Sequence, residues 1–87
     1  MNYDVYMLIS LSKKPVTYVC YTNNLKKRIN LHNKNKGAKF TKGRKWKLIY
    51  KESISSKREA ILREYYIKKN RTLRNKIKNE SLNTFTL

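Results

Sequence analysis

Five side chains spread along this chain could together cleave a phosphodiester bond. They are the tyrosines of two short segments, Asp4-Val5-Tyr6 and Tyr18-Val19-Cys20, followed by Arg28, His32 and Glu64. The glutamate matters most, because a metal ion that assists phosphate chemistry needs a carboxylate ligand. The chain offers few of them, since its acidic residues are Asp4, Glu52, Glu59, Glu64 and Glu80.

The chain is short and strongly basic, with 87 residues and a formal net charge of +17. This length is typical of one small domain. Such a positive field attracts polyanions, so nucleic acid is the first expected partner and an anionic membrane surface the second. The sequence has no apolar run of about 18 residues that would span a bilayer, and it does not begin like a signal peptide. A single cysteine, Cys20, cannot form an internal disulfide, which favours a reducing, intracellular compartment (cytoplasm or nucleoid) over secretion.

The hydrophobic pattern predicts an α+β fold in which helices flank a small, mainly antiparallel sheet of three strands. Apolar residues alternate along the first strand, and the second is rich in β-branched and aromatic residues. The predicted order is strand 3–11, strand 16–21, helix 24–33, basic loop 33–44, strand 46–51, helix 56–69 and a short basic helix 71–80. We assign residues 1–80 to a single domain and residues 81–87 to a fraying C-terminal tail.

The first predicted helix carries polar groups on its inward face. Leu25, Arg28, Ile29 and His32 lie at i, i+3, i+4 and i+7, so they share one side of the helix. An arginine alone can be a surface residue whose stem covers apolar area, and a histidine can simply be buried at an interface. The inward position favours a functional role for Arg28, whereas both interpretations of His32 stay open.

The second predicted helix places a carboxylate among apolar residues. Ala60, Ile61, Glu64 and Ile67 fall within one arc, with Glu64 at its centre. A carboxylate in such a place is unfavourable unless it has a partner. The simpler alternative is a surface ion pair between Glu64 and Lys68 at i+4, but the apolar neighbours favour a functional role.

The basic run 39–47, which leads into the third strand, carries two aromatic residues, Phe40 and Trp46. It is either a solvated loop or a contact for nucleic acid. The aromatic rings favour the second interpretation, because bases stack on aromatic side chains while cations bind the phosphates. The expected contact residues are Lys36, Lys39, Phe40, Lys42, Arg44, Lys45 and Trp46.

Taken in order, these blocks resemble the GIY-YIG nuclease superfamily, most closely its small single-domain members. The segments Asp4-Val5-Tyr6 and Tyr18-Val19-Cys20 correspond to the two tripeptides that name the family, with aspartate and cysteine where the family has glycine. The basic block 36–44 and the helix around Glu64 follow at the expected spacing. The resemblance covers about residues 3–75, and it is also a resemblance to the nuclease module of the bacterial nucleotide-excision repair incision protein.

The resemblance implies metal-dependent hydrolysis of a DNA phosphodiester bond. Glu64 would be the lone protein ligand of Mg²⁺ or Mn²⁺, since Mg²⁺ keeps several of its waters. Arg28 would stabilise the charge that develops on the phosphorus. Tyr6 or Tyr18 would orient the attacking water or take its proton, and the surrounding positive charge is expected to favour the phenolate. His32 would hold a tyrosine hydroxyl or share the role of base.

The expected function is therefore a metal-dependent endonuclease that recognises the shape of DNA rather than its sequence, in repair or recombination. Phosphate contacts carry little sequence information, so a protein partner or a homodimer is expected to supply targeting. Asn75 is the candidate for a late asparagine of the family. One alternative is a nucleic-acid-binding module on the same fold whose site is impaired by Cys20. Another is a basic protein that docks on an acidic partner or a membrane.

Overall fold

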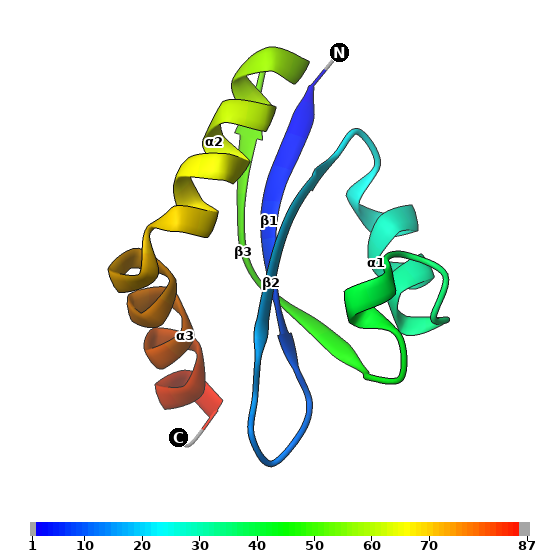
Figure 1. Cartoon of the computed structure of the whole chain (residues 1–87), viewed down its shortest axis with the longest axis vertical. Coiled ribbons are helices and arrows are strands. Elements are labelled where there is room, and N and C mark those ends of the chain that lie inside the picture. Colours follow the sequence, from blue (N-terminus) through cyan, green and yellow to red (C-terminus); the bar gives the residue numbers. More distant parts are fainter. Residues whose placement is uncertain (1, 86–87) are drawn as a thin grey trace.

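The computed structural model describes residues 2–85, which form a three-stranded antiparallel sheet with helices on both faces (Figure 1). The elements are β1 (Tyr3–Ser10), β2 (Thr17–Thr22), α1 (Leu25–Asn33), the 3-10 turn η1 (Lys39–Thr41), β3 (Trp46–Ile54), α2 (Lys57–Lys69) and α3 (Arg71–Phe85). The predicted α+β class and the predicted order of elements are confirmed. In Figure 1, α1 and η1 lie on one side of the sheet, and α2 and α3 lie on the other.

The first strand is the centre of the sheet, and this position explains why it is buried on both faces. The strand order is β2-β1-β3, and β1 pairs antiparallel with both neighbours. All residues from Val5 to Ser10 are buried, including the polar Ser10. The strand ends at Ser10, one residue before the predicted end, and Leu11 is 61% exposed. Because β1 is central, β2 and β3 are both edge strands.

Each face of the sheet has its own hydrophobic cluster. The cluster under α2 and α3 consists of Val5, Met7, Val19, Ala60, Ile67 and Ile77. The cluster under α1 consists of Tyr6, Leu8 and Trp46, and the half-buried residues that pack against it include Tyr18, Cys20, Leu25 and Ile29. The two family tyrosines, Tyr6 and Tyr18, therefore both point to the α1 face of the sheet.

Two elements are longer than predicted. Strand β3 continues to Ile54 rather than residue 51, because its pairing with β1 runs on to the pair Tyr3–Ile54. Helix α3 continues to Phe85 rather than residue 80, and no proline or glycine between 71 and 85 interrupts it. Residues 81–85 are thus helical, and the rest of the predicted tail lies outside the described residues.

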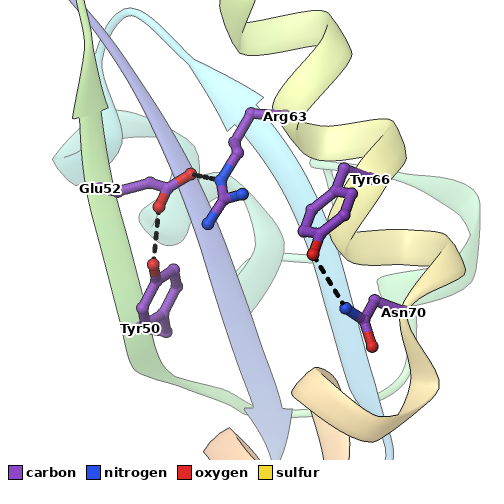
Figure 2. Close-up of polar contacts among 5 residues, drawn as sticks. All are labelled: Tyr50, Glu52, Arg63, Tyr66 and Asn70. Carbon is purple, nitrogen blue, oxygen red and sulfur yellow. Dashed lines mark hydrogen bonds and ion pairs between the residues drawn. The ribbon is translucent and has the colours of Figure 1, made fainter.

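Helix α2 is held on the sheet by a polar contact at β3 (Figure 2). The Arg63 Nε lies 2.5 Å from a carboxylate oxygen of Glu52, and the Tyr50 hydroxyl donates to the other oxygen at 2.6 Å. The Arg63 guanidinium also lies 5.0 Å from the centre of the Tyr66 ring, and the Asn70 amide donates to the Tyr66 hydroxyl. These contacts fix the rotation of α2, and so they set the direction in which the neighbouring residue, Glu64, points.

The buried arc of α2 differs from the predicted one. Ala60 and Ile67 are buried as expected, but Ile61 is 44% exposed, so that prediction is wrong. The helix packs on the sheet along Ala60 and Ile67, which places Ile61 on the rim. No helix within residues 2–85 has the length and apolar character needed to cross a membrane.

Candidate active site

The free edge of β2 is lined by two cavities, one toward each end of the strand. The first is lined by residues that include Cys20, Arg28 and Lys57. The second is lined by Thr17, Tyr18, Val19, Phe40, Lys68 and Arg74. Residues of α1 and η1 reach this edge from one face of the sheet, and residues of α2 and α3 reach it from the other. The edge strand is therefore where side chains from both helical layers meet.

A buried hydrogen-bonded chain runs from Tyr6 through His32 to Thr41. The Tyr6 hydroxyl lies 2.9 Å from His32 Nε2, and His32 Nδ1 lies 2.9 Å from Thr41 Oγ1. The Thr41 hydroxyl donates its proton to the Ala38 carbonyl at 2.9 Å, so it accepts from His32. His32 therefore carries its proton on Nδ1, and Tyr6 donates to Nε2. The expected contact between His32 and a tyrosine hydroxyl is present.

Gly37 lets the loop after α1 close over the His32 ring. A Cβ atom at position 37 would lie 2.3 Å from His32 Nδ1 and 2.8 Å from two ring carbons, which is far inside van der Waals contact. Farther along the loop, the Gly43 amide donates to Asn35 Oδ1 at 2.7 Å, and Asn35 has a left-handed φ of 63°. The basic loop is thus folded against the site rather than extended into solvent.

Tyr18 is the residue around which the predicted catalytic side chains gather. The His32 ring meets the Tyr18 ring edge-on, with centroids 5.3 Å apart. Tyr18 shares its cavity with Lys68, which pairs with Glu64, and Arg28 lines the neighbouring cavity beside Cys20. Since His32 also holds Tyr6, the five side chains that the sequence singled out share one region.

The tyrosines do not have the expected tendency to ionise. Burial, together with the nearby Cys20, raises the pKa of Tyr18 to about 12, and Arg28 offsets only part of this. Burial also raises the pKa of Tyr6 well above its ordinary value, again against the influence of Arg28. The prediction that positive charge favours a phenolate is wrong for this state, because desolvation outweighs the cation. Burial and the nearby Arg28 lower the pKa of His32, so its ring is neutral at pH 7.

Glu64 forms the ion pair with Lys68 that the sequence offered as an alternative. The Lys68 Nζ lies 2.7 Å from Glu64 Oε1, and the Glu64 side chain is only 16% exposed. No group of three or more His, Cys, Asp or Glu side chains lies together in the part of the chain that the structure describes. The donor set still fits a hydrated Mg²⁺ or Mn²⁺, because such an ion needs only one or two carboxylates and Glu64 has a second oxygen.

The residues predicted to contact nucleic acid divide into two groups. One group is exposed around η1 and before β3, and it comprises Lys36, Lys39, Phe40, Lys42, Arg44 and Lys45. Phe40 is 52% exposed and stacks on Tyr18, with centroids 5.8 Å apart. Trp46 is only 3% exposed, and its Nε1 donates to the Thr41 carbonyl. The expected base contact of Trp46 is therefore wrong, because its ring is part of the core.

Comparison with known proteins identifies the family. The sequence profile of the GIY-YIG catalytic domain matches residues 2–78. The chain belongs to the GIY-YIG family. The UPF0213 protein CPE1444 of Clostridium perfringens (strain 13) is 54% identical over 70 residues, which are 79% of this chain and 72% of that protein. The UPF0213 protein YazA of Bacillus subtilis (strain 168) is 57% identical over 53 residues, which are 60% of this chain and 54% of that protein. The matches thus span only part of each relative.

A solved structure in the same group is the solution NMR structure of the UPF0213 protein BH0048 from Bacillus halodurans. It is 38% identical, with a TM-score of 0.48, over 94% of this chain and 85% of that one.

Three residues of this site were not found from the sequence. Thr41 and Gly37 position His32, and their only sequence signal is their place in the loop that follows the His32 helix. Arg74 lines the second cavity, whereas its neighbour Asn75, the predicted asparagine, is exposed on α3 and lines neither cavity at this edge. Helix α3 has several basic residues, and the sequence does not indicate that Arg74 rather than Arg71 lines a cavity.

Proposed function

We propose that this chain is a metal-dependent endonuclease that hydrolyses phosphodiester bonds of DNA. The observation that carries the proposal is that the β2 edge brings together Tyr18, the Arg28 guanidinium from α1 and the Glu64 carboxylate from α2, which pairs with Lys68 beside the Tyr18 cavity. Membership of the GIY-YIG family supports the reaction class, and the net charge of +17 supports a polyanionic substrate.

Glu64 is the residue we assign to the metal. A divalent ion bound there supplies Lewis-acid polarisation of the phosphate and stabilises the leaving oxygen. Arg28 is assigned to the scissile phosphate, whose developing charge suits a planar guanidinium. Arg28 lines the first cavity at the β2 edge, where an anion can reach its guanidinium.

Tyr18 is the tyrosine we assign to the attacking water. It lines a cavity at the sheet edge, whereas Tyr6 is fully buried and donates to His32. Tyr6 and His32 then act as positioning residues, since the His32 ring packs edge-on against Tyr18. Because the pKa of Tyr18 is about 12 in the free protein, its hydroxyl keeps its proton at pH 7 and orients the water. It takes the proton of the water only if the substrate complex lowers that pKa.

The exposed cations beside the site are assigned to the DNA backbone. Lys36, Lys39, Lys42, Arg44 and Lys45 are all exposed and belong to one segment between α1 and β3. Contacts of this kind recognise charge and backbone shape rather than base sequence. We therefore propose cleavage directed by DNA structure, as repair or recombination requires, with a protein partner or a second copy providing the target.

Nicking of supercoiled plasmid tests this function. Wild-type protein with Mg²⁺ or Mn²⁺ should convert the plasmid to the open circle, and EDTA should stop the conversion. Glu64→Gln should remove the activity, whereas the matched control Glu59→Gln, an exposed acid on the same helix, should keep it. Equal cutting by wild type and Glu64→Gln would refute the role of Glu64. Cutting that continues in EDTA would refute the metal.

A nucleic-acid-binding module without catalysis is the second candidate, and one contact favours it. Lys68 already neutralises Glu64 at 2.7 Å, so the carboxylate has a partner without any metal. This candidate predicts tight, salt-sensitive binding of DNA with no cutting under any metal. It also predicts that Glu64→Gln and wild type respond identically when Mn²⁺ is added to the DNA complex.

A further inference from the structure

Two arginines share an unusual property. Arg28 Nε and Arg74 Nε are the buried side-chain nitrogen or oxygen atoms that lack a hydrogen-bond partner within the described residues. They lie on opposite helical layers, since Arg28 comes from α1 and Arg74 from α3, yet each lines a cavity at the β2 edge. The proposed function uses Arg28 and leaves Arg74 unexplained.

The cavity that Arg74 lines is suited to an anion. It has a volume of about 270 Å³, and its charged lining residues are Lys68 and Arg74, with no acidic side chain among them. Tyr18 and Phe40 form an aromatic wall on the other side. An arginine and a lysine that line one cavity can bind a phosphate together, the guanidinium through its fork of N–H donors and the lysine as a point charge.

We propose that this cavity is a second phosphate subsite, in which Arg74 and Lys68 bind a backbone phosphate of the DNA other than the scissile one. The subsite rests on the proposed endonuclease function and extends it. The second cavity is lined by residues 17–19 of β2 and the first by residues 20–22. The middle residues of these two runs, Tyr18 and Tyr21, lie about 10 Å apart along an extended strand. We therefore assign the two arginines to different phosphates of the DNA.

Lys68 links this subsite to the proposed metal ligand. In the free protein Lys68 pairs with Glu64 at 2.7 Å, and it also lines the cavity beside Arg74. A phosphate in the cavity competes with Glu64 for the lysine. Binding of DNA therefore releases the Glu64 carboxylate, and by linkage a cation on Glu64 favours binding of DNA at the subsite.

The sharpest test counts phosphate contacts through the salt dependence of DNA binding. Binding of a short duplex is measured by fluorescence anisotropy in EDTA, so that no cutting is needed, across a series of salt concentrations. Each phosphate that a cation neutralises steepens the fall of log K with log[salt] by about 0.9, whatever the register of the protein on the DNA.

Arg74→Gln should weaken binding and should lower this salt slope by about 1. Its matched control is Arg71→Gln, an exposed arginine on the same helix, which should keep the wild-type slope. Lys68→Gln should have a smaller slope than the exposed control Lys69→Gln. Arg74→Lys keeps the charge and should keep the wild-type slope, which guards against a folding defect in the glutamine variant. Arg28→Gln combined with Arg74→Gln should lower the slope by about 2, because the two arginines hold different phosphates.

The outcomes separate the subsite from the function. A wild-type protein that binds and cuts DNA, while Arg74→Gln and Arg71→Gln show identical salt slopes, overturns the subsite and leaves the nuclease intact. A double variant, Arg28→Gln with Arg74→Gln, whose slope equals that of Arg74→Gln alone also overturns the subsite, since one phosphate then serves both arginines. A wild-type protein that neither binds nor cuts DNA overturns the proposed function itself.

Discussion

Replacing Gly37 by alanine probes how the basic loop supports the candidate site. The added Cβ would lie 2.3 Å from His32 Nδ1 and 2.8 Å from Cγ and Cε1 of the same ring. The ring cannot retreat easily, because His32 is fully buried and is hydrogen-bonded at both nitrogens, to Tyr6 and to Thr41. Either the loop lifts off the histidine or the histidine gives up its two partners.

The size of the effect follows from these contacts. Losing two hydrogen bonds costs about 1 kcal/mol each, and an extra carbon in a packed interior costs about 1–3 kcal/mol. The alanine stiffens the unfolded chain, which returns about 0.4–1 kcal/mol. The net loss is about 2–5 kcal/mol, a large share of the roughly 4–13 kcal/mol expected for 87 residues.

Urea denaturation followed by the fluorescence of Trp46, the single tryptophan, measures this loss directly. Gly43→Ala is the control. It has no atom within 4 Å of its added Cβ, but its φ of +80° gives backbone strain alone, about 1–2 kcal/mol. NMR titration of the only histidine separates the two variants further. The His32 pKa should rise toward its ordinary value in Gly37→Ala and stay low in Gly43→Ala. Equal stability losses with an unchanged His32 pKa would refute the reasoning.

Three further outcomes are expected. Burial lowers the pKa of His32 in the folded protein. The unfolded chain therefore binds a proton on His32 at about pH 6.5, whereas the folded chain leaves the ring neutral. Stability should therefore fall as pH drops below that value, and His32→Gln should flatten this dependence in urea titrations. Arg63→Gln should lower stability by about 0.5–1.5 kcal/mol relative to Arg58→Gln in thermal unfolding, since Arg63 pairs with Glu52 but is 38% exposed. Ser56→Ala should cost about 1 kcal/mol in the same assay, because the Ser56 side chain caps α2.

The order and type of the elements could be predicted from the local sequence pattern, but the ends of β3 and α3 could not. Alternating apolar residues are sufficient to place β1, and β-branched and aromatic residues are sufficient to place β2. The spacing of the inward residues at i, i+3 and i+4 is sufficient to place α1. The end of β3 was missed because Lys51-Glu52-Ser53 lacks an apolar alternation. Glu52 lies in that strand because it pairs with Val5 of β1, and Arg63 from α2 binds its carboxylate. No local pattern reports such distant partners.

The sequence predicted the right types of residue on the inward face of α1, but it predicted the wrong ionisation for the tyrosines. The inward stripe of α1 carries Arg28 and His32 as expected, with His32 fully buried. The ionisation of Tyr18 was predicted from charge alone, whereas its pKa is set first by desolvation, which depends on packing between distant elements. Trp46 was assigned to DNA because it follows a basic run, but it ends that loop and begins β3 as a core residue.

The position of the candidate site at the edge of the sheet follows from the strand order. An edge strand leaves backbone groups unpaired, and proteins protect such edges with charge. Here Lys57, Lys68 and Arg74 reach the edge of β2 from one layer and Arg28 reaches it from the other. Like charges repel a second copy of the strand, whereas they attract a polyanion. The same cations that keep β2 from pairing with another chain therefore make this edge the place where a DNA backbone can lie, with Tyr18 and Glu64 beside it.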